Sequence, residues 1–279
     1  MSYKPDELKK VQAIEVEVLK EIIRICEKNK IEYFGFYGTV LGAVRHNGFI
    51  PWDDDIDIAM LRDDYDRFLE IAPSQLSPGF SLQHFTTEQD APAYFAKVRK
   101  DGTKFVESNF KHLDIHHGIF VDVFPLDKIP TNVYAKKKHY YLTQLWLQAY
   151  LSKSLYKTAK HVTSNPFKRV CADAVRTILH ILLLPVKKSW LFRQLDKSAC
   201  KYRDSDSTLV SFCNTPWEWD SSWLLPTKKV PFEDTYIAIP ANYDEVLKNR
   251  YGDYMKLPPE DKRVSHMPYE LDFGSDGNK

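Results

Sequence analysis

The sequence predicts an α+β protein, in which a mixed β-sheet is flanked by helices and joined to a basic helical insertion or subdomain. Three observations predict this class: an apolar stripe of helical period opens the chain, short apolar or alternating runs follow as far as residue 124, and residues 131–201 return to helical spacing. Because no long linker separates these parts, we expect one compact unit. Its expected divisions are a core over 1–127, the insertion over 128–203, and a C-terminal segment over 204–279 that packs back on the core.

The first elements are a helix, a short strand and a second helix. A helix is predicted over 5–29, because its apolar residues recur every three or four positions, at Leu8, Val11, Ile14, Val18, Ile22 and Ile25. The aromatic run 33–37 predicts a strand, the small residues Gly38 and Thr39 predict a turn, and residues 40–45 predict the first turns of a helix.

The following strands contain isolated acids. Residues 53–60 end in an alternation of acidic and apolar residues, typical of a half-buried strand, so Asp55 and Asp57 are expected on the same face. After a helix over 63–71, short strands are predicted, over 82–85, 94–99 and 119–124. The last of these is an apolar run interrupted by Asp122.

Two long helices and a small C-terminal segment complete the pattern. The helices are predicted over 131–160 and 166–201, separated near Ser164-Asn165-Pro166, where the proline suits a helix start. The C-terminal segment is expected to hold strands over 230–232 and 236–239, and a helix over 243–250 with a capping box at Asn242 and Glu245 and a closing Gly252.

Composition excludes several classes of protein. The 279 residues are 43% hydrophobic with a net charge of +1, which supports a substantial core and does not suit a general nucleic-acid binder. The longest apolar run, Ile181 to Val186, is shorter than the roughly 20 residues of a membrane span. The N-terminus has no apolar segment behind its first charges, so we expect no secretory signal and a cytoplasmic protein. The four cysteines lack metal-ligand spacing.

The near-neutral total hides a basic middle segment. Residues 128–203 carry 16 basic and two acidic side chains, a net charge of +14, while the flanking segments are acidic. A solvated surface of long helices is one interpretation of this charge. The other is attraction of an anionic polymer, a diphosphate substrate or an anionic membrane, on which the basic amphipathic helices would lie at the surface.

The chemical argument depends on Gly38 and Thr39, on Asp55 and Asp57, and on Asp122. Two carboxylates on one strand face repel each other unless a cation lies between them, and Mg²⁺ or Mn²⁺ prefers such oxygen ligands. A glycine lets a phosphate approach the backbone, and the Thr39 hydroxyl can hold it beside the metal. Asp122 is an isolated acid in an apolar strand, which a divalent cation would stabilise. Three carboxylates around one or two metals support in-line phosphoryl transfer.

Residues 38–58, which run from Gly38-Thr39 to Asp55-Ile56-Asp57-Ile58, resemble the signature of the LicD family of phosphotransferases, which includes the fukutin-related proteins. Residues 118–127 resemble the second acidic strand of that family, and residues 231–255 resemble its C-terminal segment. The family belongs to the polymerase-β-like nucleotidyltransferase superfamily, so the resemblance implies a nucleotidyltransferase-like fold with its catalytic core in residues 1–127. Residues 128–203 carry no recognised motif.

The resemblance implies transfer of a phospho-alcohol, typically phosphocholine from CDP-choline, to a hydroxyl of a glycan or lipid-linked glycan, with release of CMP. The acceptor would be a teichoic-acid-like polymer or a surface polysaccharide. In this interpretation Asp55 and Asp57 hold Mg²⁺ or Mn²⁺ against the diphosphate, and Asp122 completes a second metal site or accepts the proton of the attacking hydroxyl. No nucleic-acid partner is expected, and contact with the inner face of the plasma membrane would be peripheral.

Cationic and aromatic candidates surround this motif. Arg45, inside the signature, is a candidate for binding phosphate, as are Lys97 and Arg99, for which a surface role is equally open. Trp52 is a candidate for stacking on cytosine or for contacting a trimethylammonium group, with a place in the core as the alternative.

Two histidines and one further acid complete the candidates. His46 and His266 lie in segments that resemble the family, so each is a candidate for substrate binding and proton transfer, against a structural role. Asp54, next to Asp53, either contacts the metal ligands without binding the metal itself or caps a turn.

Two other functions are compatible with parts of this pattern. An Asp-x-Asp motif also occurs in metal-dependent glycosyltransferases, but these usually place it after a longer nucleotide-binding region than the helix and strand that precede it here. A non-catalytic scaffold could bind anionic polymer or membrane through the basic helices, but it has no need of three convergent acids. Release of CMP or of UDP from the matching donors separates the two enzymes, and liposome flotation tests the scaffold.

Overall fold

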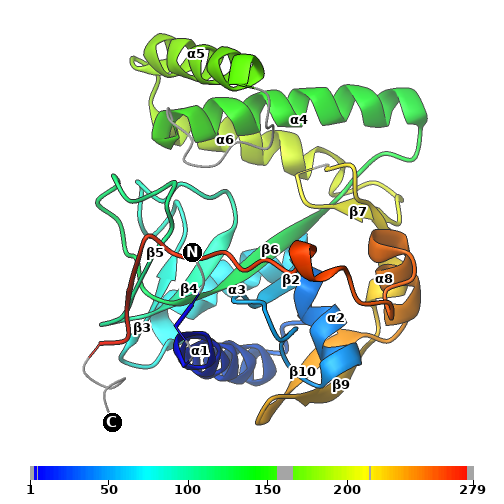
Figure 1. The fold of residues 1–279 in the computed structure, drawn as a ribbon. Coiled ribbons are helices and arrows are strands. Elements are labelled where there is room, and N and C mark those ends of the chain that lie inside the picture. The colour runs from blue at the N-terminus through cyan, green and yellow to red at the C-terminus, as the bar shows by residue number, and fades with distance from the viewer. Residues whose placement is uncertain (1–2, 5, 156–165, 214, 275–279) are drawn as a thin grey trace.

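The computed structural model describes residues 3–4, 6–155, 166–213 and 215–274 (Figure 1). Its helices are α1 (Glu7–Asn29), α2 (Tyr37–His46), α3 (Arg62–Gln75), α4 (Val133–Ser154), α5 (Pro166–Leu183), α6 (Lys188–Ala199), α7 (Ser221–Leu224) and α8 (Tyr243–Tyr251). Its strands are β1 (Phe34–Gly35), β2 (Asp57–Leu61), β3 (Phe80–Gln83), β4 (Ala96–Lys100), β5 (Lys104–Val106), β6 (Phe120–Lys128), β7 (Leu209–Ser211), β8 (Trp219–Asp220), β9 (Thr227–Phe232), β10 (Thr235–Pro240) and β11 (Glu270–Asp272). The predicted α+β class is confirmed.

The central sheet is mixed, as predicted. Its main path has the strand order β1-β2-β6-β4-β3, and β7 extends it by pairing with the end of β6 and with β8. β2 and β6 run parallel, whereas the other pairs are antiparallel. The hairpin β9–β10 and the pair β5–β11 form two further small sheets. The parallel pair matters most, because it brings residue 57 beside residue 122.

The two faces of the central sheet bury different cores. Val121 and Val123 of β6 pack in the core that includes α1 and α3, whereas Phe124 and Leu126 pack in a second core. Because side chains alternate along a strand, Asp122 lies on the second face. That face, opposite α1 and α3, is where the polar residues of β2, β4 and β6 gather.

α1 confirms the predicted N-terminal helix, and Lys30, in the left-handed region with φ of 53°, ends it. Its buried apolar residues lie along one side of the helix, and they include Val11, Val18, Leu19, Ile22 and Ile25. This stripe covers the sheet, which is the physical reason that the helix forms where the period predicted it.

The strand predicted over 33–37 is shorter than expected. The Phe36 N–H donates to the Asp57 carbonyl at 2.8 Å, and the chain then enters α2 at Tyr37, whose φ is 41°. A positive φ is uncommon and strained for a bulky residue, so packing must hold Tyr37 in place. Consequently Gly38 and Thr39 lie in the first turn of α2, and the prediction of a separate turn there was wrong.

The basic segment forms three helices on one side of the molecule (Figure 1). The helix predicted over 166–201 divides into α5 and α6, because Pro185 cannot continue the helical hydrogen bonds. The predicted turn at Ser164 and Asn165 lies outside the described residues, as does the predicted end of the preceding helix. None of the helices in the described ranges has the length and apolar character needed to cross a bilayer. The domain boundaries at 127 and 203 stay a prediction.

The remaining predicted strands and the C-terminal helix are confirmed with small shifts in their ends. The predicted capping box is absent, because the Asn242 side chain donates to the Ser222 carbonyl at 3.2 Å and makes no cap contact with α8. β5, β7, β8 and β11 were not predicted. Each has only two or three residues, which is too short for an apolar pattern to show.

Candidate active site

Three charged residues lie in one row across three neighbouring strands. Asp57 on β2 is paired in register with Asp122 on β6, which in turn is paired with Lys97 on β4. The Lys97 Nζ lies 2.9 Å from the Asp122 Oδ1, and both side chains are buried. The structure therefore brings Asp122 beside Asp57, as the sequence predicted, and adds a cation whose partner the sequence did not identify.

The first turn of α2 positions Asp57. The backbone N–H of Asp57 donates to the Thr39 Oγ1 at 2.8 Å, and Thr39 is buried. A Cβ on Gly38 would lie 2.8 Å from the Asp53 Oδ2, so only glycine lets that carboxylate approach the helix start. The small residues singled out in the sequence thus contact the acids directly. Binding of a phosphate by Gly38 and Thr39 stays a prediction.

A second group of metal-binding residue types lies beside this row. Asp53, Asp54 and His266 each offer one ligand atom, and these atoms all lie within 4.8 Å of one another. The His266 backbone N–H donates to the Asp54 Oδ1 at 2.7 Å, and its Nδ1 lies 3.4 Å from the Asp55 Oδ2. Among the described residues, Asp55, Asp57 and Asp122 do not approach one another as closely as this group does.

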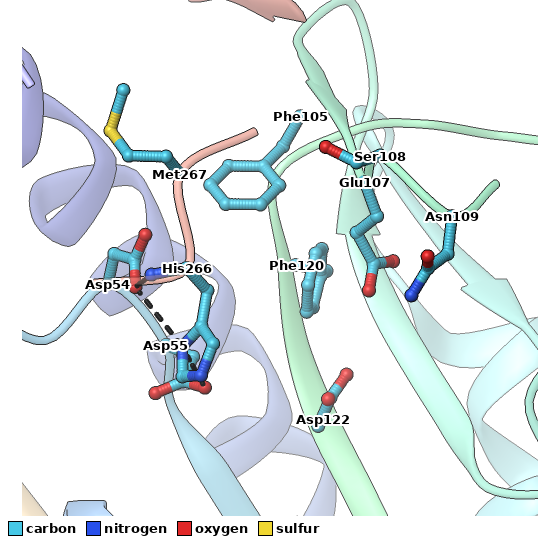
Figure 2. Close-up of a pocket in the computed structure, with 10 residues that line it drawn as sticks. All are labelled: Asp54, Asp55, Phe105, Glu107, Ser108, Asn109, Phe120, Asp122, His266 and Met267. Carbon is cyan, nitrogen blue, oxygen red and sulfur yellow. Dashed lines mark hydrogen bonds and ion pairs between the residues drawn. The ribbon is translucent and has the colours of Figure 1, made fainter. Parts of the chain in front are cut away.

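Figure 2 shows a pocket of about 220 Å³ that Asp54, Asp55, Asp122 and His266 line. Asp57 is not part of its lining. Asp54, Asp55 and His266 form one side, and Phe120 and Glu107 lie across from them. Asp122 lies on β6, the same strand as Phe120 and two residues further along it. The full lining also includes Phe105, Ser108, Asn109 and Met267. A mixed wall of acids and aromatic rings suits a cation more than it suits a neutral sugar alcohol.

Burial and mutual repulsion perturb the acids. Burial, and then the charges of Asp55 and Asp122, raise the pKa of Asp57 well above its usual value. Burial and the Asp53 charge raise the pKa of Asp55 to about 7, and burial raises that of Asp122 to about 6 although Lys97 opposes the change. Asp57 and Asp122 face each other in the row, and Asp55 adjoins it. A divalent cation would remove this repulsion, so the oxygen-rich residues fit Mg²⁺ or Mn²⁺.

Asp54 and His266 carry opposite charges at neutral pH. Burial raises the pKa of Asp54, but hydrogen bonds from His266 and from the Tyr3 hydroxyl outweigh it and hold the pKa below its usual value. The hydrogen bond to Asp54 raises the pKa of His266 to about 9, even though its side chain is 70% exposed. Asp54 thus links Tyr3 and His266, which lie near opposite ends of the chain, to the loop of residues 53–55, the acidic loop.

Three of the predicted substrate residues lie elsewhere. Arg45 and His46 are at the other end of α2 from Gly38, about 10 Å along the helix axis. There the Arg45 Nη1 donates to the Tyr254 carbonyl and its Nε to His46, both at 2.9 Å. The Arg263 guanidinium lies over the Trp52 ring, with its carbon 5.0 Å from the centre of that ring. The structure does not bring Arg45, His46 or Trp52 to the row of Asp57, Asp122 and Lys97, which we call the carboxylate row.

Arg99 lies on β4 beside the site but is occupied by protein groups. It is buried, its Nε donates to the Gln83 Oε1 at 2.8 Å, and its Nη1 donates to the Gly118 carbonyl at 2.6 Å. These contacts hold the loop before β6 and leave little for a substrate. Lys97 is likewise engaged, by Asp122 and by Glu107 at 3.4 Å.

Sequence reasoning missed two residues near the acids. Glu15 on α1 is 1% exposed, its Oε2 has no hydrogen-bond partner among the described residues, and burial and the Asp55 charge raise its pKa well above the usual value. Its only signal in the sequence was an acid inside an apolar helical stripe. Glu107 follows β5, a strand too short to be predicted.

A third missed residue is Arg250, near the end of α8. Its guanidinium lies 4.0 Å from the ring centre of Trp217 and 5.5 Å from that of Tyr37, and its Nε is buried without an acceptor among the described residues. In the sequence it was only the last residue of a predicted helix.

Comparison with known proteins identifies the family. The model of the LicD/FKTN/FKRP nucleotidyltransferase domain matches residues 30–172, which is slightly more than half of the chain. The chain belongs to this family. The match spans Gly38, Thr39 and all the acids of the carboxylate row, and the chain is thus a LicD-family transferase, as its motifs predicted.

Named relatives cover different shares of this LicD-family chain. The lipopolysaccharide cholinephosphotransferase LicD of Haemophilus influenzae is 28% identical over 93% of this chain and 95% of its own length. The human ribitol 5-phosphate transferase FKRP is 25% identical over 36% of this chain and 19% of its own length. Similarity to LicD therefore extends through the basic helices and the C-terminal segment, whereas similarity to FKRP does not cover the whole chain.

Proposed function

We propose that this LicD-family protein transfers phosphocholine from CDP-choline to a hydroxyl of a glycan or lipid-linked glycan and releases CMP. The observation that carries the proposal is the carboxylate row, in which β2 and β6 set Asp57 beside Asp122, while Asp122 and Asp55 line one pocket. The similarity over nearly all of the chain to an enzyme named for cholinephosphate transfer supports choline as the transferred alcohol. The aromatic and acidic lining of the pocket supports the same choice, because quaternary cations favour such walls.

The proposal includes a divalent metal, Mg²⁺ or Mn²⁺. Asp55, Asp57 and Asp122 would hold it, with Asp53, Asp54 and His266 as the neighbouring group that could supply further ligands. A bound divalent ion would neutralise the diphosphate and stabilise the charge that develops on the transferred phosphoryl group.

The protein groups account for the remaining requirements of the reaction. The acceptor hydroxyl oxygen forms a bond to the phosphorus of the phosphocholine group, and the bond from that phosphorus to the bridging oxygen breaks, which releases CMP. The hydroxyl proton goes to a carboxylate. Asp122 suits this role, because it lies beside Asp57 and its pKa of about 6 in the metal-free protein leaves it ionised at pH 7. Lys97 compensates the Asp122 charge before substrate binds.

Arg250 is the cation that we assign to the donor phosphates. Arg45, Lys97 and Arg99 are bound by protein acceptors, whereas Arg250 is held by aromatic stacking, and no hydrogen bond or ion pair of its guanidinium is found among the described residues. A guanidinium of this kind suits contact with phosphate oxygens through its terminal nitrogens. It also contacts Tyr37, the residue before Gly38, so it lies beside the helix start at which the sequence predicted phosphate binding.

A donor panel tests the proposal. The purified protein is incubated with CDP-choline, CDP-ribitol or UDP-sugars, with Mg²⁺ or Mn²⁺ and a panel of glycans, and nucleotide release is measured. We expect CMP from CDP-choline, and the Asp57→Asn variant should lose on the order of 10³-fold in rate without a change in fold. Asp114→Asn, an exposed acid away from the row, is the matched control. Release of CMP from CDP-ribitol but not from CDP-choline would show that the transferred group is ribitol phosphate. Release of UDP from UDP-sugars would support a glycosyltransferase.

The proposal also includes the cellular location of the protein and the class of its acceptor. We propose that the protein acts in the cytoplasm, at the inner face of the plasma membrane, on an acceptor such as a teichoic-acid-like polymer or surface polysaccharide. The basic charge of residues 128–203 supports this position. Product analysis with lipid-linked and free glycans identifies the acceptor class.

A further inference from the structure

Helix α5 carries a continuous apolar face that is exposed. The exposed residues recur at steps of one to four, so at 100° per residue they share one side of the helix: Val170, Cys171, Ala174, Val175, Ile178, Ile181 and Leu182. Val170 is 68% exposed and Leu182 is 66% exposed. Single exposed apolar residues are ordinary, but a contiguous face of this length marks a surface that binds something.

The opposite side of α5 is firmly packed against α4. Leu183 packs into the core of the basic helices, the His180 Nδ1 lies 2.8 Å from the Ser152 carbonyl, and the Lys153 Nζ donates to the Leu183 carbonyl at 2.9 Å. The orientation of the helix is therefore set by contacts on its inner side. Its apolar face points outward because the other face is the one that α4 binds.

The position of α5 in the molecule favours contact with an extended surface. Figure 1 shows α5 as the outermost helix, with α4 between it and α6. Two further apolar side chains follow it, Leu184 at 58% exposure and Trp190 at 40%.

Charge separates the two occupants that could cover this face. The segment 128–203 has a net charge of +14, and within it Lys187, four residues after the end of α5, is exposed. A second copy of the chain packed face to face would bring two such segments together, at a cost in repulsion. An anionic lipid surface would instead attract the segment while the apolar side chains enter the headgroup region.

We propose that the apolar face of α5 lies in the surface of an anionic membrane and anchors the protein there. This places the pocket near a lipid-linked acceptor, a link that rests on the proposed function, whereas membrane binding itself does not.

Vesicle sedimentation tests the proposal. The full-length protein is mixed with vesicles of phosphatidylcholine alone, or of phosphatidylglycerol with phosphatidylcholine, at low and high salt. We expect binding to the mixed vesicles that weakens in high salt. The triple variant Val175→Gln, Ile178→Gln, Leu182→Gln should bind the mixed vesicles at least about tenfold more weakly than wild type, because three apolar contacts with the lipid are lost. Tyr236→Gln, an apolar residue 63% exposed on β10, is the matched control and should bind like wild type.

The outcomes separate this inference from its rivals. Absence of wild-type binding, or equal binding by the triple variant, overturns it. Light scattering that shows a wild-type dimer which the triple variant abolishes also overturns it, because a second copy then covers the face. Circular dichroism checks that the triple variant is folded, and the single variant Ile178→Gln is used if it is not. Asp57→Asn should lose CMP release but still bind vesicles, which separates membrane binding from catalysis. A wild-type protein that binds vesicles but releases no CMP from CDP-choline would reject only the proposed function.

Discussion

Individual side chains set the electrostatics of the pocket. Asp122 and Asp57 face each other across β2 and β6, and the only cation paired with Asp122 in the described residues is Lys97. Lys97 also lies 3.4 Å from the ring centre of Phe120, which holds its ammonium against the second face of the sheet. Lys97 is shared with Glu107, and the protonated His266 near Asp55 is shared with Asp54. These two cations cannot balance Asp55, Asp57 and Asp122 together, which is the residue-level reason to expect a divalent ion.

Replacing Arg250 should weaken use of the donor. In Arg250→Met we expect kcat/KM for CDP-choline to fall about 10- to 100-fold, the loss typical of a charge-assisted phosphate contact, mainly through a higher KM. Lys248→Met, on the same helix and paired only with Asp244 at the surface, should change it little. Steady-state CMP release measures both. Equal kinetics for wild type and Arg250→Met would reject the assignment.

Replacing Glu15 should change the pH dependence of stability. Because the pKa of Glu15 is raised in the folded protein, the folded state holds its proton longer than the unfolded chain, and stability falls as pH rises above about 4.5. Glu15→Gln removes this loss, so the metal-free variant should be more stable than wild type at pH 7, by about 1.4 kcal/mol per unit of pKa elevation.

Urea unfolding in a chelator, at pH 4.5 and pH 7, measures this difference. The gain should shrink as the pH falls to 4.5, because about half of the unfolded chains are then protonated at Glu15 as well. A variant that is less stable than wild type at pH 7 would show that the ionised Glu15 carboxylate is needed in the fold. Glu17→Gln, a more exposed acid on the same helix, is the control.

At the scale of elements, a buried ion pair joins α3 to the end of β6. The Arg62 Nε and Nη2 donate to the two Asp127 oxygens at 2.6 and 2.7 Å, and both residues are buried. No partner of Asp127 was predicted from the sequence. In the structure it anchors the crossover between the two parallel strands, and thereby the register that aligns Asp57 with Asp122.

Arg62→Met should destabilise the protein by about 3–5 kcal/mol, because it leaves Asp127 buried without its partner. Arg67→Met removes an exposed arginine from the same helix and should cost about 1 kcal/mol or less. Chemical denaturation measures both. The double variant Arg62→Met, Asp127→Leu should recover part of the lost free energy of unfolding. Absence of recovery would mean that packing of the arginine side chain, not the charge pair, stabilises the contact between α3 and β6.

At the scale of the whole molecule, the C-terminal segment closes the site. It crosses from the Arg45 contact at Tyr254, past Trp52 and Arg263, to His266 at Asp54, and then pairs β11 with β5. The pocket in Figure 2 is therefore assembled from the acidic loop, the central strands and the last part of the described chain. Stability and metal binding should be coupled through this arrangement.

Metal addition should stabilise the folded chain. Mn²⁺ at about 100 times its dissociation constant should add about 2.7 kcal/mol and raise the melting temperature, because the unfolded chain cannot gather acids from segments so far apart. Chelation should reverse the shift and abolish CMP release. Asp122→Asn should lose most of the shift, whereas Asp114→Asn should keep it. A shift unchanged in Asp122→Asn would move the metal to the group of Asp53, Asp54 and His266.

The sequence was sufficient for the features that depend on local pattern. The period of α1, the alternation that leads into β2, the isolated acid in β6 and the excess of basic residues in 128–203 each predicted what the structure contains, because burial on one face imposes a period along the chain. The tertiary structure decided which side chains meet. Strand register set Asp57 beside Asp122 and Lys97, the length of α2 carried Arg45 away from the acids, and chain closure brought His266 to Asp54. These contacts depend on packing between distant segments, which no local pattern encodes, and the same is true of the apolar face that α4 leaves exposed on α5.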